Sequence, residues 1–137
     1  MKQEILDLLL EKALQARQKS YCPYSHFSVG AALLAKDGSI YTGANIENAS
    51  YTPTVCAERV AFFDAVHAGA RAFKAIAIVG GSEGENPATF CPPCGVCRQV
   101  MSEFCTKDFQ IILYDGTQSK AYTLDELFPL RFELKND

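Results

Sequence analysis

Two short stretches of the sequence carry residue types that can bind a metal and transfer protons. They are Cys56-Ala57-Glu58 and Pro93-Cys94-Gly95-Val96-Cys97. Zinc favours thiolate ligands in a tetrahedral arrangement, and a catalytic zinc site keeps one position open for water. Cys94 and Cys97 are three residues apart, so both sulfurs would face one ion at the start of a helix. The two stretches predict a hydrolytic zinc site if the fold brings them together.

Three neighbouring side chains complete this hypothesis. Cys56 can supply the third sulfur, and Glu58 would lie beside the metal-bound water without being a ligand. Three thiolates leave a divalent ion with net negative charge, which opposes deprotonation of the water. Arg59 could donate to a ligand sulfur and so restore the acidity of the metal. The alternative role for Arg59 is a surface ion pair.

The register of the metal ligands is ambiguous because Cys91, Cys94 and Cys97 form two overlapping C-x-x-C pairs. Two prolines separate Cys91 from Cys94 and indicate a loop. Cys94 and Cys97 fit a first helical turn that begins at Pro93, where the helix dipole favours thiolates. We therefore favour Cys94 and Cys97. Two alternatives remain open: Cys91 could close a structural four-cysteine site, or the cysteine pair could be redox-active.

Composition restricts the class of protein. The sequence predicts one domain covering residues 1–137, with 48% hydrophobic and 21% charged residues. A net charge of −3 argues against nucleic-acid binding, which needs a concentrated basic face. No apolar run is long enough to cross a membrane and no signal-peptide pattern is seen, so we expect a cytoplasmic protein. In that compartment six cysteines indicate metal or redox chemistry rather than disulfides.

Hydrophobic periodicity predicts one mixed sheet between helices. The first helix covers Gln3 to Lys19, with Arg17 and Lys19 at the negative end of its dipole. The other predicted elements are strands at 27–35 and 40–45 joined by a hairpin turn, a helix at 55–68 closed by Gly69, a strand at 73–79, a loop at 80–93, a helix at 93–105, strands at 109–114 and 121–123, and a short helix ending at 129.

One motif match is rejected. Gly80-Gly81-Ser82-Glu83-Gly84 has the G-x-S-x-G form of a nucleophile elbow, but no helical pattern follows it at once. His26 and His67 both lie upstream, whereas the elbow fold needs a histidine downstream. We predict structural roles for both histidines.

The sequence resembles the small, homotetrameric cytidine deaminases over nearly its whole length. The segments that carry the resemblance are Cys22-Pro23-Tyr24-Ser25-His26-Phe27, Asn45-Ile46-Glu47-Asn48-Ala49, Cys56-Ala57-Glu58-Arg59, Pro93-Cys94-Gly95-Val96-Cys97-Arg98-Gln99 and Leu127-Phe128-Pro129. The C-A-E and P-C-x-x-C pair is specific for the zinc deaminase superfamily. The resemblance implies an α/β fold, a three-layer α/β/α sandwich with a mixed five-stranded sheet.

The resemblance also implies an activity. Cys56, Cys94 and Cys97 would bind Zn²⁺, and Glu58 would carry protons while water attacks C4 of the pyrimidine. The expected reaction is hydrolytic deamination of cytidine and 2′-deoxycytidine to uridine and 2′-deoxyuridine, with release of ammonia, in pyrimidine salvage. The alternatives are deamination of a related cytosine nucleoside such as blasticidin S, or a structural zinc module.

The remaining roles concern the nucleoside. The resemblance implies that the Ala57 N–H holds the base carbonyl, that Phe27 stacks on the base, and that Asn45 and Glu47 bind the ribose hydroxyls. Residues two apart in an extended segment point to the same side, which suits a shared sugar, although turn polarity alone would also explain Asn45 and Glu47. In the implied homotetramer, Tyr51 and Phe132 match positions that face a neighbour's nucleoside.

Overall fold

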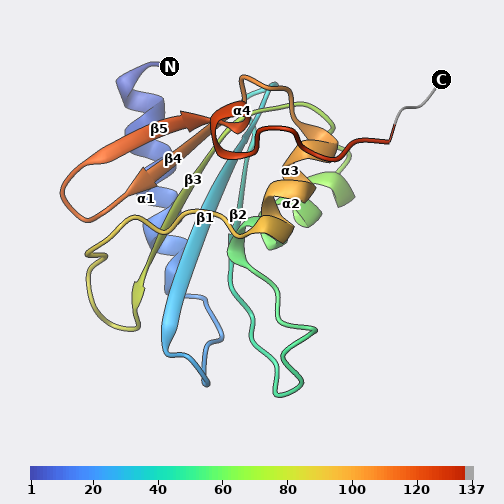
Figure 1. The fold of residues 1–137 in the computed structure, drawn as a ribbon. Coiled ribbons are helices and arrows are strands. Elements are labelled where there is room, and N and C mark those ends of the chain that lie inside the picture. Colours follow the sequence, from blue (N-terminus) through green and yellow to red (C-terminus); the bar gives the residue numbers. More distant parts are fainter. Residues whose placement is uncertain (135–137) are drawn as a thin grey trace.

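The computed structural model describes residues 1–134 as four helices and five strands (Figure 1). In chain order these are α1 (Gln3–Arg17), β1 (Phe27–Ala35), β2 (Ile40–Ala44), α2 (Ala57–His67), β3 (Phe73–Ser82), α3 (Gly95–Phe104), β4 (Gln110–Tyr114), β5 (Ser119–Thr123) and α4 (Leu124–Leu127). This order confirms the predicted succession of elements. None of the described helices is long and apolar enough to cross a membrane.

The strands form one mixed sheet in the order β2-β1-β3-β4-β5. β1 pairs antiparallel with β2 and β3, β3 pairs parallel with β4, and β4 pairs antiparallel with β5. β3 therefore lies at the centre, and its residues from Ala75 to Val79 are fully buried, as expected for a strand covered on both faces. The predicted mixed five-stranded sheet is confirmed.

Helices cover both faces of this sheet, α1 on one side and α2 with α3 on the other (Figure 1). Each face has its own apolar cluster. The α1 side contains Leu9, Ala13, Ala32, Leu34 and Ile112, and the α2–α3 side contains Phe62, Ile76, Ile78, Met101 and Ile111, among others. Alternating side chains of each strand supply the two clusters. The three-layer sandwich is confirmed.

Two glycines allow the helices to pack directly on the strands. A Cβ atom on Gly30 would lie 2.0 Å from the Ala13 carbonyl oxygen, and one on Gly43 would lie 2.4 Å from that of Ala57. Only glycine permits such a close approach of backbones. Because Ala57 is the first residue of α2, the contact at Gly43 fixes the position of the first helical turn, which carries Glu58.

Several predicted boundaries are wrong by a few residues, for identifiable reasons. β3 continues to Ser82 rather than 79, because its last residues pair with the start of β1. α1 ends at Arg17, so Lys19 lies beyond it, and the Arg17 side chain is buried. The short helix ends at Leu127 rather than 129, and a Thr123–Glu126 capping box fixes its start.

The starts of α2 and α3 also differ from the prediction. α2 begins at Ala57 because Val55 is held in a bridge with Ile46. α3 begins at Gly95, with Cys94 as its N-cap, so Pro93 precedes the helix instead of opening it. No helix lies between β3 and α3 in the described chain, which agrees with rejection of the nucleophile elbow.

Candidate active site

Three cysteine sulfurs form a cluster that could hold one metal ion. The Sγ atoms of Cys56, Cys94 and Cys97 all lie within 4.8 Å of one another. The Cys56–Cys94 separation is 3.7 Å and the Cys94–Cys97 separation is 3.5 Å. Tetrahedral zinc with Zn–S bonds of about 2.3 Å places two sulfurs about 3.8 Å apart, so the donor set fits zinc. Among the described residues, this group consists of three members, and Cys91 is not one of them.

Two helix N-termini converge on this cluster. Cys56 is the N-cap of α2 and Cys94 is the N-cap of α3, while Cys97 lies in the first turn of α3. The backbone N–H of Cys97 donates to the Cys94 sulfur. The positive ends of both helix dipoles therefore favour negative charge at the sulfurs, which is the form that binds metal.

The environment of Cys56 also favours its thiolate. Its pKa is lowered to about 5, first by the hydrogen bond from the Cys97 thiol and then by that from Arg59. The same bond raises the pKa of Cys97, which holds the shared proton. These contacts favour a thiolate at Cys56, at the N-terminus of α2.

Glu58 is a buried carboxyl beside the sulfurs. It lies in the first turn of α2 with 4% of its surface exposed. Burial raises its pKa to about 7, and the negative charge of Cys56 acts in the same direction. A carboxyl that titrates near neutral pH can accept a proton and return it, as acid–base catalysis requires.

Arg59 contacts the cluster from the same helical turn. Its Nη2 donates to Cys56 Sγ at 3.6 Å, and its Nε is buried without a hydrogen-bond partner in the described structure. The guanidinium therefore faces a sulfur, as expected for a group that withdraws negative charge from a metal ligand.

Cys91 lies beside the site rather than in the sulfur cluster. A Cβ atom added to Gly80 would meet Cys91 Sγ at 2.8 Å and Phe27 Cε2 at 3.0 Å, so this thiol and this ring both pack over Gly80. Burial raises the pKa of Cys91 to about 11, with further contributions from the charges of Glu58 and Cys56. Cys91 is therefore a neutral thiol that the charge of Glu58 influences.

Asn45 and Glu47 both hold local structure. Asn45 is nearly buried: its Nδ2 donates to the Phe27 carbonyl and its Oδ1 accepts from Val29 N, both at 2.9 Å. Glu47 accepts from the backbone N–H of Tyr24 at 3.0 Å and from both the backbone N–H and the hydroxyl of the next residue, Ser25. Sequence patterns gave no sign of these partners, which lie at the start of β1 for Asn45 and in the segment before β1 for Glu47.

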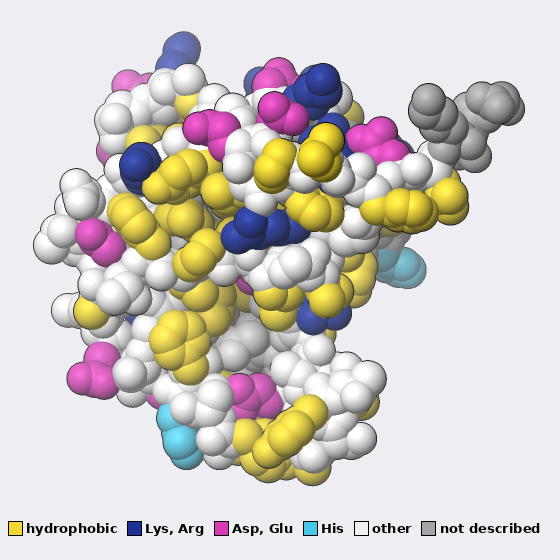
Figure 2. Space-filling view, viewed as in Figure 1, with side chains coloured by type: hydrophobic (Ala, Val, Ile, Leu, Met, Phe, Trp, Pro, Cys, Tyr) yellow, Lys and Arg dark blue, Asp and Glu magenta, His cyan; other side chains and the backbone are white. Residues whose placement is uncertain are grey.

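A cavity of about 370 Å³ lies between the segment before β1 and the loop from β2 to α2. Figure 2 shows the surface hollowed below α2 and α3. Glu47 and Tyr51 line this cavity, and Phe27 stands at the start of β1 with 38% of its surface exposed. Of the predicted nucleoside-binding residues, Glu47 and Tyr51 therefore share one cavity.

The other two predicted substrate residues lie at different places. Ala57 is the first residue of α2, where a backbone N–H has no intrahelical acceptor. Phe132 lies in the C-terminal segment, with 65% of its surface exposed, and its carbonyl accepts from Gln99 of α3 at 3.1 Å.

Arg98 is a residue whose contacts were missed by the sequence reasoning. Its Nε donates to the Pro93 carbonyl at 2.8 Å, and its Nη1 donates to the Leu127 carbonyl. It therefore joins the segment before Cys94 to the end of α4. In the sequence, the position of Arg98 directly after Cys97 was the one indication that it lies near the site.

Fold and site together define a zinc deaminase architecture: a mixed sheet between helices, three clustered thiols and a buried glutamate. A family model described as "Cytidine and deoxycytidylate deaminase zinc-binding region" matches residues 3–113. The chain belongs to this family, and zinc is its metal.

Individual relatives agree with this assignment. A cytidine deaminase from Sporosarcina psychrophila is 52% identical over 108 residues, which cover 79% of this chain and 76% of the relative. The crystal structure of cytidine deaminase from Burkholderia pseudomallei has a TM-score of 0.84 and 41% identity, covering 96% of this chain and all of that one. A blasticidin-S deaminase from Bacillus cereus is less similar, at 35% identity over 107 residues, with 76% of each chain covered.

Proposed function

We propose that this protein is a zinc-dependent cytidine deaminase. It hydrolyses cytidine and 2′-deoxycytidine to uridine and 2′-deoxyuridine and releases ammonia. The observation that carries this proposal is the buried carboxyl of Glu58 beside three clustered sulfurs. A zinc ion held by these three sulfurs would keep its fourth position for water. A closed structural zinc module would need a fourth protein ligand there.

The metal is held by Cys56, Cys94 and Cys97. Zinc bound to these thiolates supplies the Lewis acidity that makes a water molecule nucleophilic at neutral pH. Arg59 supports this acidity, because its hydrogen bond withdraws negative charge from Cys56.

Glu58 moves the protons. Its carboxylate takes a proton from the attacking water and delivers it to N3 of the pyrimidine. Glu58 then takes the second proton, from the hydroxyl now bonded to C4, and passes it to the amino group, so that the C4–N bond breaks, ammonia leaves and the C4 carbonyl forms. This is the sequence established for zinc-dependent nucleobase deaminases, and the raised pKa of Glu58 suits it.

The nucleoside is held by groups from three elements. The Ala57 N–H at the start of α2 binds the base carbonyl, and Phe27 stacks on the base from the start of β1. Asn45 and Glu47 bind the ribose hydroxyls. The position of Glu47 in the cavity supports this arrangement, while the buried amide of Asn45 also fixes the backbone around Phe27.

The active form in this proposal is a cytoplasmic homotetramer that serves pyrimidine salvage. Tyr51 and Phe132 would each reach the nucleoside of a neighbouring subunit. Both side chains are large and apolar, with 76% and 65% of their surfaces exposed, which supports a place against another copy.

Replacement of Arg59 by Gln is expected to lower kcat by about 10–100-fold, because the thiolates then keep their full negative charge. Metal analysis should find zinc still bound. An unchanged kcat would remove Arg59 from the mechanism. Exposed Arg71, which bonds only to the carbonyls of Val66 and Ala70 in the described structure, gives the matched Arg71→Gln control.

The test of the proposed activity is incubation of zinc-loaded protein with cytidine, 2′-deoxycytidine and blasticidin S in parallel. Ultraviolet absorbance and ammonia release are followed together. Turnover of the two simple nucleosides is expected. Selective turnover of blasticidin S would replace this function by the alternative.

A further inference from the structure

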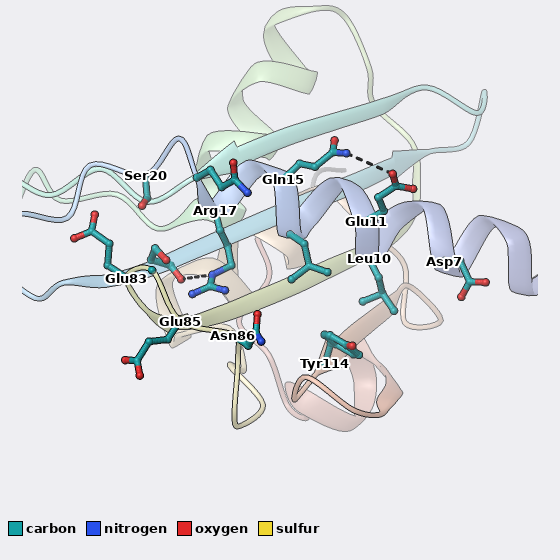
Figure 3. Close-up of a pocket in the computed structure, with 14 residues that line it drawn as sticks. Asp7, Leu10, Glu11, Gln15, Arg17, Ser20, Glu83, Glu85, Asn86 and Tyr114 are labelled. Atoms are coloured by element: carbon teal, nitrogen blue, oxygen red, sulfur yellow. Dashed lines mark hydrogen bonds between the residues drawn. The ribbon is translucent and has the colours of Figure 1, made fainter.

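Arg17 is a buried cation outside the site described above. It lies in the last turn of α1 with 8% of its surface exposed, at one end of a cavity of about 730 Å³ on the α1 side of the sheet. Figure 3 shows its guanidinium directed from α1 towards β1 and β3. Its Nε donates to the Ser28 carbonyl at 3.0 Å and its Nη2 to the Ser82 carbonyl at 3.2 Å. Within residues 1–134 no carboxylate forms an ion pair with it.

These two carbonyls belong to the open end of the β1–β3 ladder. Phe27 pairs with Ser82, and Ser28 pairs with Gly81. Backbone at the end of a ladder opens easily because few bonds hold it. Arg17 ties both strand ends to α1 at this point.

The same strand end carries Phe27 on its other face. Ser28 lines the cavity beside α1, and side chains alternate along a strand, so Phe27 and Val29 face the α2–α3 layer. There the Phe27 ring packs beside Cys91 over Gly80. Asn45 bonds to the backbone of Phe27 and Val29, and Arg17 bonds to the residue between them.

We propose that Arg17 is a positioning residue for nucleoside binding: acting across the sheet, it holds the start of β1 so that Phe27 presents its ring to the base. The inference rests on the proposed function, which gives Phe27 its stacking role. Arg17 itself touches neither substrate nor metal. Loss of its two hydrogen bonds lets the ring move, and a displacement of the order of 1 Å is enough to weaken a contact that depends on geometry.

The test is a double-mutant cycle with steady-state kinetics on cytidine. Arg17→Lys keeps the positive charge but cannot bond to both carbonyls with the geometry of a guanidinium. It is expected to raise KM about tenfold, within the range for lost base–aromatic stacking, while kcat changes less than about twofold. Phe27→Ala should raise KM by a similar factor. The double variant should have the KM of Phe27→Ala alone, because both changes remove one contact.

A control separates positioning from general stability. Ile112→Val lies in the apolar cluster on the α1 side and should lower stability with KM unchanged. If Arg17→Lys does not fold, Arg17→Gln, which keeps an amide donor, takes its place in the cycle. Multiplicative KM effects in the double variant, or an unchanged KM in the Arg17 variant, would overturn the inference. If the wild-type protein does not deaminate cytidine, the proposed function itself has failed.

Discussion

Replacing Glu58 by Gln is expected to leave zinc bound and to lower turnover of cytidine by about 10⁴-fold. The amide has nearly the same shape as the carboxyl, so the start of α2 and the sulfur cluster should persist. It cannot take the proton of the water or pass it to N3, and general acid–base catalysis is worth about 10²–10⁴-fold. We expect the upper end of that range because one carboxyl serves every proton transfer.

Metal analysis and single-turnover kinetics on the same sample provide the measurement. Glu103→Gln makes the identical chemical change at an exposed position of α3 and should be fully active. If the Glu58→Gln protein retained more than a tenth of wild-type activity, Glu58 would not be the proton carrier. Loss of zinc in that variant would instead make Glu58 part of the metal site.

Replacing Cys94 by Ala is expected to remove zinc, whereas Cys91→Ala should retain it. Cys94 Sγ lies 3.7 Å from Cys56 Sγ and 3.5 Å from Cys97 Sγ, and the cluster has three members. Two thiolates hold zinc far more weakly than three. Because metal binding contributes free energy of folding, the Cys94 variant should also melt at a lower temperature.

Zinc content after dialysis and the thermal midpoint are measured for both variants with and without added zinc. Added zinc should raise the midpoint of Cys91→Ala but not that of Cys94→Ala. Loss of zinc from both variants would make Cys91 a ligand as well, as in the shifted register or in the structural site that Cys91 closes. Zinc retained by Cys94→Ala would contradict the three-cysteine site.

Much of the fold could be predicted from local signals. The Asp37-Gly38 turn predicted the β1–β2 hairpin, and Gly38 adopts a φ of 94° that favours glycine. Gly69 follows α2 with a φ of 102°, as a helix-closing residue does. These features depend on a few adjacent residues, so the sequence alone contains them.

The contacts that support the site could not be predicted in this way. Arg17 was expected in the last turn of a helix, at the negative end of its dipole, but its burial against the carbonyls of Ser28 and Ser82 was not predicted. These partners are 11 and 65 residues away along the chain. The hydrogen bonds from Asn45 to β1 also join residues that are far apart in the sequence. Such partners are determined by how the layers pack, which periodicity does not report.

The choice of metal ligands among Cys91, Cys94 and Cys97 could be predicted only in part from the sequence. Spacing favoured Cys94 and Cys97 over Cys91, on the prediction that Pro93 lies in the first turn of the helix. In the structure Cys94 and Cys97 do cluster, but Cys94 is the N-cap of α3 and Pro93 precedes the helix. Cys91 lies instead against Gly80, beside Phe27. The pair that clusters with Cys56 in the structure was therefore selected from a predicted helix start that was misplaced by two residues.

The central claim is that this chain deaminates cytidine with zinc held by three thiolates, and removal and return of the metal tests it most directly. Purified protein is incubated with cytidine while the absorbance change to uridine is followed, before chelation, after it and after addition of zinc. We predict full conversion, then loss of activity with the metal, then recovery on addition of about one zinc per chain. Conversion that is unaffected by complete removal of zinc, or no conversion by the zinc-loaded protein, would contradict the account.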